Sequence, residues 1–273
     1  MIQSISFRFF QGVICVLFMG CYHEVPRFDT LNDTSPLFKS IYFSSTPPLK
    51  TLYRADANAQ VLWVVIEGDG HAWMNPHKPT ADPTPYRPIG WAFAQSINQD
   101  SILYLTRPCQ YLDKKERQAC TSIDWTNGRF ASKWVDLLNH SIDIIKKQMP
   151  EKNIILVGYS GGGTMATLMA TRRDDVSLLI TIASPLDTDA WTKYHHVSSL
   201  DASLNPKVFQ TTLVTLKQIH LVGKYDDVVP KFLIYDFLRS YSSQKSVRVI
   251  EIEADHIHFP PLDWQKLKNS FSN

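Results

Sequence analysis

The chain has 273 residues, of which 44% are hydrophobic and 20% are charged, and its net charge at neutral pH is +2. This composition excludes a disordered chain, which needs low hydrophobicity and a high net charge, and the length suits one domain with a sizeable core. The weak charge and the lack of a dense run of lysine and arginine argue against nucleic acid as a partner.

The N-terminus has the layout of an export signal. Arg8 precedes an apolar run from Phe9 to Met19, which is too short for a transmembrane helix, because that needs roughly 20 apolar residues. A positive charge, a short apolar run and a small residue are instead typical of a secretory signal peptide, which we predict over residues 1–20. A tether over residues 21–40 and one folded domain over residues 41–273 are expected to follow.

The end of this signal resembles a bacterial lipobox, in the run Leu17-Phe18-Met19-Gly20-Cys21. The resemblance implies that Cys21 becomes the lipidated first residue of the mature protein, although Phe18 stands where the pattern prefers leucine. Tyr22 is not the aspartate that retains such proteins at the inner membrane. The resemblance therefore implies an exported lipoprotein, anchored by its N-terminal lipid to the bacterial membrane, on the periplasmic side of the outer membrane. The alternatives are a cleaved signal, which would give a soluble periplasmic or secreted protein, and a plain apolar N-terminal segment.

The remaining cysteines predict a disulfide. Cys15 lies inside the signal and Cys21 would carry lipid, which leaves Cys109 and Cys120 in a polar, loop-like stretch. In an oxidising compartment these two can be joined, and the alternative is two free thiols. A lone pair without neighbouring cysteine or histidine clusters does not indicate a zinc site.

Short apolar runs in chain order predict the strands. Residues 41–45 and 51–57 are separated by Thr46-Pro47-Pro48, which suits an antiparallel pair at the edge of a sheet. The later runs are mostly continuous, as in strands that are buried on both faces of a parallel sheet. They cover residues 61–66, 102–106, 154–158, 176–183, 219–222 and 247–252.

Helices are predicted between the later strands. The stretch from Ala131 to Met149 places Val135, Leu138 and Ile142 at helical spacing, and Pro150 ends it. Further helices are expected at residues 161–173, 231–241 and 263–271, and a long, proline-rich loop at residues 75–88. The sequence therefore predicts a single-domain α/β fold, with a doubly wound, mostly parallel sheet and helices on both faces.

The strongest chemical signal is Gly158-Tyr159-Ser160-Gly161-Gly162, which lies between a predicted strand and a predicted helix. This is the context of a nucleophile elbow, G-x-S-x-G. Its tight turn needs glycine beside the serine and projects the Ser160 hydroxyl at a helix N-terminus, where a developing oxyanion is favoured. The alternatives are a glycine-rich turn without catalytic function and a phosphate-binding loop, but no G-x-x-x-x-G-K-[ST] motif is present.

Candidates for an acid and a base follow the last two predicted strands. Asp226 and Asp227 follow the first of these, and His256 and His258 follow the second. Because the carboxyl ends of parallel strands meet at one edge of the sheet, Ser160 would meet one aspartate and one histidine there. The chain order serine, aspartate, histidine is that of the α/β hydrolases.

From about Val61 to Phe271 the sequence resembles the α/β-hydrolase superfamily. The run G-x-x-D-x-x-V-P that begins at Gly223 is similar to the acid loop of the superfamily, which implies Asp226 rather than Asp227 as the acid. The same resemblance implies His256 rather than His258 as the base. Asp187 is a less favoured acid. Residues 107–111 and 125–130 also resemble a group of uncharacterised bacterial hydrolases.

The resemblance further implies a second oxyanion donor from the loop after the strand at residues 61–66. This loop reads Glu67-Gly68-Asp69-Gly70, where the superfamily usually has His-Gly in place of its first two residues. We expect the backbone N–H groups of Gly161 and Asp69 to form the oxyanion hole, with Gly70 as the alternative.

The sequence thus predicts a serine hydrolase that cleaves small-molecule esters through an acyl-enzyme on Ser160, with no cofactor and no metal. The adjacent His195 and His196 would point apart rather than share a metal. The segment 186–217 is too short for a large lid domain, so an open cleft is expected. The alternatives are a membrane-anchored peptidase or thioesterase, and a non-catalytic binding protein with a hydrolase fold.

Overall fold

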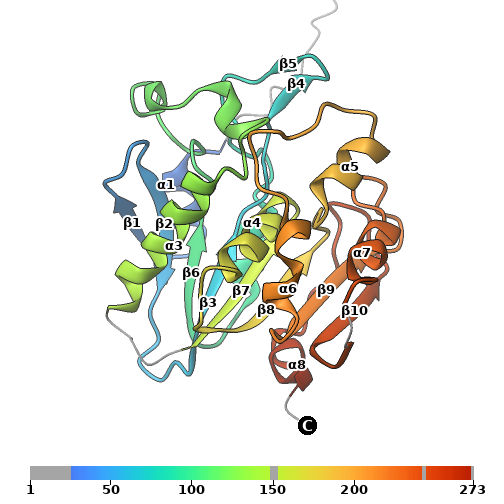
Figure 1. Ribbon diagram of the computed structural model, residues 1–273. Helices are drawn as coiled ribbons and strands as arrows, with labels where there is room; N and C mark the ends of the chain where they lie inside the picture. Colours follow the sequence, from blue (N-terminus) through green and yellow to red (C-terminus); the bar gives the residue numbers. More distant parts are fainter. Residues whose placement is uncertain (1–25, 148–152, 242–243, 272–273) are drawn as a thin grey trace, which may run out of the picture.

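The computed structural model describes residues 26–147, 153–241 and 244–271. Within this part of the chain, an eight-stranded sheet has the order β1-β2-β6-β3-β7-β8-β9-β10 (Figure 1). Its strands are β1 (Lys39–Phe43), β2 (Leu49–Arg54), β3 (Val61–Ile66), β6 (Ser101–Leu105), β7 (Asn153–Tyr159), β8 (Val176–Ile182), β9 (Gln218–Gly223) and β10 (Val247–Ile252).

The first two strands form the antiparallel edge that the sequence predicts, with Ile41 opposite Thr51. Strand β2 also runs antiparallel to β6, whereas all other neighbours in the sheet are parallel. The carboxyl ends of β3, β7, β8, β9 and β10 therefore lie along one edge of the sheet. The predicted doubly wound, mostly parallel α/β fold is confirmed.

Helices cover both faces of this sheet. One face packs against α3 (Ser132–Lys146) and α4 (Gly161–Ala170), and the other against α1 (Phe28–Asp33), α2 (Ile89–Ser96) and α8 (Trp264–Lys268). None of the helices in the described ranges is long and apolar enough to cross a membrane. The remaining α-helices are α5 (Thr188–Tyr194), α6 (Gln210–Leu213) and α7 (Lys231–Leu238), and 3-10 turns cover Glu116–Ala119, Ser122–Trp125, Pro206–Phe209, Gln244–Ser246 and Asn269–Phe271.

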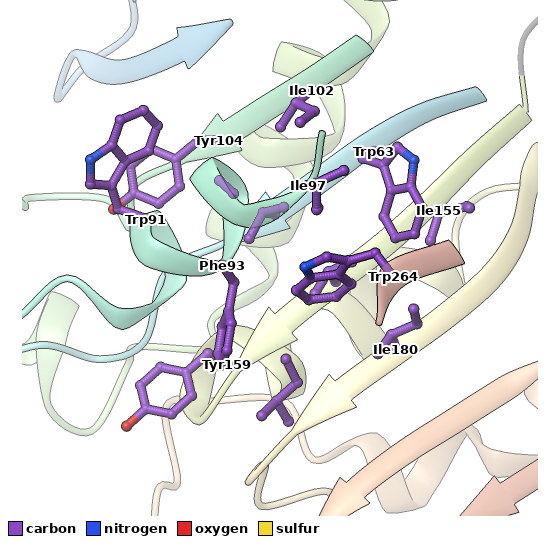
Figure 2. Close-up of a cluster of buried hydrophobic side chains, with 14 of the residues drawn as sticks. Trp63, Trp91, Phe93, Ile97, Ile102, Tyr104, Ile155, Tyr159, Ile180 and Trp264 are labelled. Atoms are coloured by element: carbon purple, nitrogen blue, oxygen red, sulfur yellow. The ribbon is translucent and has the colours of Figure 1, made fainter. Parts of the chain in front are cut away.

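Strand β3 illustrates how the core fills on both sides. Its side chains alternate, so that Trp63 packs in the layer of α2 and α8 while Leu62 packs in the layer of α3 and α4. The Trp63 ring lies edge-on to the Trp264 ring of α8, with centroids 5.8 Å apart (Figure 2). Phe93 of α2 contacts the same Trp264 ring at 5.9 Å. These aromatic contacts fix α2 and α8 on the sheet.

The described part of the predicted tether belongs to the folded domain, which corrects the boundary at residue 41. Phe28 and Leu31 of α1 are each 4% exposed, and Phe38 is 2% exposed. A short helix with two buried apolar side chains gives too weak a periodic signal to be distinguished from a tether in the sequence. The predicted signal at residues 1–20, Cys21 and the helix end at Met149 lie outside the described residues.

The region between β3 and β6 holds more structure than the sequence predicts. A small antiparallel pair, β4 (Trp73–Asn75) and β5 (Lys78–Pro79), occupies the start of the predicted loop at residues 75–88. Helix α2 follows that loop and was not predicted, because its eight residues come directly after Pro88 and carry no side-chain cap of their own.

Candidate active site

Ser160 lies in the turn between β7 and α4, at the carboxyl edge of the sheet. Its backbone angles are φ 51° and ψ −126°, a sparsely populated region for a residue other than glycine. Its N–H donates to the carbonyl of Ile182 at 2.8 Å, which holds the turn against β8. A Cβ atom on Gly158 would lie 2.3 Å from the carbonyl oxygen of Gly162. The turn therefore requires glycine at this position and presents the Ser160 hydroxyl to the cleft.

A chain of hydrogen bonds joins Ser160, His256 and Asp226. Nε2 of His256 lies 3.1 Å from Oγ of Ser160, and Nδ1 of the same ring lies 2.9 Å from Oδ2 of Asp226. The Asp226 side chain is completely buried. Its second oxygen accepts the backbone N–H groups of Val228 and Val229 at 2.9 and 2.8 Å. Since both carboxylate oxygens are engaged, Asp226 has a fixed orientation and keeps Nε2 of His256 directed at Ser160.

The competing acids and bases lie outside this chain of hydrogen bonds. Asp227 is exposed beside Asp226. His258 is also exposed, and its ring contacts Asp255 at 2.8 Å. The side chain of Asp187 caps the N-terminus of α5. The structure therefore brings together the three residues that the motif spacing favours and excludes their alternatives from the contact.

Glu67 fixes the loop that follows β3. Its carboxylate is buried and accepts the N–H groups of Gly68, Gly90 and Trp91 at 2.8, 3.1 and 3.1 Å, together with the hydroxyl of Tyr104 at 2.8 Å. Burial raises the pKa of this carboxyl group. These contacts tie the loop to the start of α2. Glu67 thereby caps this helix, which has no side-chain cap from a neighbouring residue. Because Glu67 occupies the Gly68 N–H, that group is not available as an oxyanion donor.

Asp69 lies against Gly161, so the two residues expected to form the oxyanion hole are adjacent. A Cβ atom on Gly161 would lie 2.0 Å from Oδ1 of Asp69. The Asp69 carboxylate is paired with Nη1 of Arg107 at 2.8 Å and with Nε of Arg129 at 3.3 Å, and both arginine side chains are at most 9% exposed. Burial lowers the pKa of Arg107. The two arginines thus offset the charge of the Asp69 carboxylate beside Ser160, so that this carboxylate does not oppose an oxyanion.

These two arginines lie in the segments that resemble uncharacterised bacterial hydrolases, but the sequence alone assigned them no role. Nothing in the spacing of Arg107 and Arg129 indicates that both would meet Asp69, because each comes from a different loop.

Comparisons with known proteins agree with the fold. A family model described as a PGAP1-like alpha/beta domain matches residues 121–250. No curated protein matches the sequence significantly. Among solved structures, an esterase from Pyrococcus furiosus is similar with a TM-score of 0.61 at 14% identity, over 86% of this chain and 90% of that one. An alpha-beta serine hydrolase homologue from Coxiella burnetii has a TM-score of 0.52 at 14% identity, over 80% and 89% of the two chains.

A serine hydrolase without a lid from Xanthomonas campestris is similar with a TM-score of 0.51 at 12% identity, over 81% of this chain and 86% of that one. The chain has the α/β-hydrolase fold. The fold implied by the resemblance to this superfamily is therefore confirmed. In this α/β-hydrolase fold, residues 186–217 contain only α5, α6 and the 3-10 turn at Pro206–Phe209, and no lid domain.

The hydrolase fold also contains the predicted disulfide between Cys109 and Cys120, whose Cα atoms are 6.2 Å apart. It joins the loop after β6 to the 3-10 turn at Glu116–Ala119. Gln110, next to Cys109, donates from Nε2 to the carbonyl of Gly68 at 3.0 Å and accepts the N–H of Arg107 at 3.0 Å. The disulfide therefore sits in the loop that supports Gly68, next to Asp69.

Two cavities of the hydrolase fold meet at Ser160. The larger has a volume of about 530 Å³, and His256 and Tyr159 line it together with Tyr86 and Ile89. The smaller has a volume of about 30 Å³ and lies on the side of α5, and His256 is not among its lining residues. Asp69 lines both. A further cavity of about 520 Å³, on the outer side of α2, shares Tyr86, Arg87 and Ile89 with the larger one and extends to Pro26.

Proposed function

We propose that this protein is a serine hydrolase that cleaves carboxylic esters of small molecules through an acyl-enzyme on Ser160. The observation that carries the proposal is the uninterrupted contact from Oγ of Ser160 through His256 to the buried carboxylate of Asp226. A serine hydroxyl is a weak nucleophile until a neighbouring base takes its proton, and this arrangement supplies that base together with the group that orients it.

In the first half of the reaction, Nε2 of His256 accepts the Ser160 proton while Oγ attacks the ester carbonyl carbon. Asp226 retains its contact with Nδ1 and stabilises the imidazolium that forms. The carbonyl oxygen becomes an oxyanion, for which the N–H groups of Gly161 and Asp69 are the proposed donors. The ester C–O bond then breaks, and the alcohol leaves with the proton from His256.

In the second half, a water molecule gives a proton to His256 and attacks the acyl carbon on Ser160. The bond between the acyl carbon and Oγ breaks, Oγ regains the proton, and a carboxylic acid is released. Arg107 and Arg129 neutralise the side chain of Asp69 throughout, so that its carboxylate does not oppose the oxyanion in either half.

The same residues could act on a thioester or a peptide. The fold similarity to the esterase from Pyrococcus furiosus supports an ester. Residues 186–217 hold no lid domain, which leaves the cleft open to small molecules.

A fluorophosphonate probe tests the proposal, because it labels only an activated serine. The wild-type protein should be labelled and should hydrolyse p-nitrophenyl acetate, whereas Ser160→Ala should do neither while remaining folded by circular dichroism. Ser199→Ala, which changes an exposed serine on the loop after α5, is the matched control and should behave like the wild type. If Ser160→Ala keeps more than a tenth of the activity, Ser160 is not the nucleophile. An amide and a thioester analogue tested in parallel separate the three substrate classes.

We also propose that the hydrolase is exported and anchored through a lipid on Cys21, with the outer membrane as its location in a Gram-negative source. The proposal rests on the lipobox resemblance in the sequence and is tested separately from the chemistry.

A further inference from the structure

We infer that the small cavity beside Ser160 is the acyl subsite, and that it restricts the enzyme to short, uncharged acyl groups, acetyl or propionyl, on a bulky, largely apolar alcohol. This inference rests on the proposed function and deepens it. Three observations carry it: the position of His256 relative to the two cavities, the size of the smaller one, and the contacts that hold its walls.

The position of His256 assigns one cavity to each half of the ester. The leaving alcohol must receive its proton from Nε2 of His256, so its oxygen has to lie on the side of that ring. His256 lines the larger cavity and is not among the residues that line the smaller one. The alcohol therefore occupies the larger cavity, and the acyl chain that stays on Ser160 extends into the smaller one.

The size of the smaller cavity limits the acyl chain. Its volume is about 30 Å³, which is two to three times the roughly 10–15 Å³ that a water-sized group needs. The cavity thus has room for two or three non-hydrogen atoms. An acetyl or propionyl group fits, whereas an octanoyl chain does not.

The walls of this cavity are held in place by polar contacts. Nε1 of Trp191 donates to the carbonyl of Val228 at 2.7 Å. The Arg129 guanidinium stacks on the Trp191 ring at 5.7 Å and on the Phe130 ring at 5.6 Å, while its Nε pairs with Asp69 at 3.3 Å. Expansion of the cavity would break these contacts, so its size discriminates between chains.

The charge around the cavity favours an uncharged acyl group. Arg129 and Asp69, which both line it, are paired with each other. An anionic group would have to approach the Asp69 carboxylate, and a cationic group would approach Arg129. The rest of the wall is mostly apolar, with Phe130, Pro185, Leu200 and Val229.

The larger cavity suits a bulky alcohol. Its volume of about 530 Å³ is in the range of roughly 300–1,000 Å³ that accommodates drug-sized ligands. Its aromatic lining includes Tyr86 and His71, whose rings are 4.6 Å apart, and Tyr159. Such rings favour an apolar or aromatic alcohol over a small polar one.

A series of p-nitrophenyl esters tests the acyl limit, because the alcohol is constant and only the chain length changes. We expect kcat/KM for the acetate and propionate to exceed that for the octanoate by at least about 100-fold, since the extra methylenes have no cavity to enter. A preference for the octanoate would overturn the inference. With acetates of different alcohols, 1-naphthyl acetate should be hydrolysed at least as efficiently as phenyl acetate, and the reverse order would contradict the alcohol assignment.

Two substitutions of lining residues make the test specific. Leu200→Ala enlarges the cavity at a partly exposed position and should raise the ratio of butyrate to acetate hydrolysis about tenfold. Leu200→Phe fills the cavity and should lower acetate hydrolysis. Val228→Ala, at a residue that is 38% exposed, is a second enlarging variant if Leu200→Ala does not fold. Leu37→Ala, at a residue that is 71% exposed and lines neither cavity, is the matched control and should change nothing.

The outcomes separate this inference from the proposed function. Without labelling by the fluorophosphonate and without hydrolysis of any ester, the proposed function fails and the inference fails with it. If the protein is labelled and hydrolyses esters, but both enlarging variants keep the chain-length preference of the wild type, the proposed serine hydrolase function is retained. Only the assignment of the small cavity as the acyl subsite is then wrong.

Discussion

The hydroxyl of Tyr159 donates a hydrogen bond of 2.9 Å to the backbone carbonyl of His256, so the residue before the proposed nucleophile, Ser160, holds the proposed base. Figure 2 shows the Tyr159 ring beside Phe93 in the buried cluster. Burial raises the pKa of the Tyr159 phenol, which keeps it protonated and able to donate.

Tyr159→Phe removes this hydrogen bond and keeps the ring. We expect a loss of about 1 kcal/mol in the free energy of unfolding and a several-fold fall in kcat with little change in KM, because the His256 loop is less well positioned. Steady-state kinetics with p-nitrophenyl acetate measure this. Tyr235→Phe removes an exposed hydrogen bond to Glu251, away from the cleft, and should leave kcat unchanged. Equal effects of the two variants would show that Tyr159 has no positioning role.

Neighbouring residues test the assignment of the acid and the base. Asp226→Asn and His256→Ala should each lower kcat by roughly 10³-fold or more, because they remove members of one hydrogen-bonded unit. Asp227→Asn and His258→Ala are the matched controls, since both side chains are exposed, and should retain most of the activity. If kcat falls more in the control variants than in Asp226→Asn and His256→Ala, then Asp227 and His258 are the acid and the base.

His220 predicts how stability depends on pH. This histidine is buried in β9 beside Thr181, and burial lowers its pKa from 6.5 to about 4. Between these values the unfolded chain binds a proton that the folded chain does not, so stability is lost as the pH falls from about 6.5 to about 4. The full loss from this group is about 3 kcal/mol. The free energy of unfolding, measured with urea at several pH values, should depend less steeply on pH in His220→Asn than in His140→Asn. The second variant is the control, because it changes an exposed histidine of α3. Equal slopes would exclude His220 as the cause.

The disulfide between Cys109 and Cys120 should stabilise the fold by roughly 3 kcal/mol, as expected for closing a short loop. Thermal unfolding with and without reductant measures this, and the intact mass should differ by the mass of two hydrogen atoms. Because Gln110 and Arg107 belong to the same loop, reduction should also lower kcat. The variant with serine at both positions should be insensitive to reductant, and a reductant effect that persists in it would have another origin.

Lipidation predicts that the mature chain begins at Cys21 and partitions with membranes. Cys21→Ser should release active enzyme into the soluble fraction or block its maturation, as judged by fractionation and N-terminal mass analysis. Stable anchoring of this kind needs two or more acyl chains. If the wild-type protein is recovered soluble, or begins at another residue, an ordinary cleaved signal takes the place of the anchor.

The sequence predicts those parts of the site that are encoded locally. Ser160, Asp226 and His256 each follow a strongly apolar strand, and parallel strands bring such positions to one edge whatever the loops between them do. The pairing of Cys109 with Cys120 is predicted because they are the two cysteines left after the signal and lipobox.

Features that depend on distant contacts were not predictable in the same way. Helix α2 is capped by Glu67, which precedes it by more than twenty residues, so no local start signal marks it. Asp69, Arg107 and Arg129 meet only after three loops have folded. Helix α1 owes its place to the burial of Phe28 rather than to its propensity.

Because the fold begins near Pro26, only a short stretch of chain would link the domain to a lipid on Cys21. The described chain enters the domain at Pro26, in a hollow that shares Tyr86 and Ile89 with the cleft at Ser160. Pro26 comes five positions after Cys21, and a chain of that length reaches at most roughly 18 Å. A lipid on Cys21 would therefore keep the hollow at Pro26, and the cleft that adjoins it, close to the bilayer. Such a short linker would favour the hydrolysis of esters that dissolve in the membrane or lie on its surface.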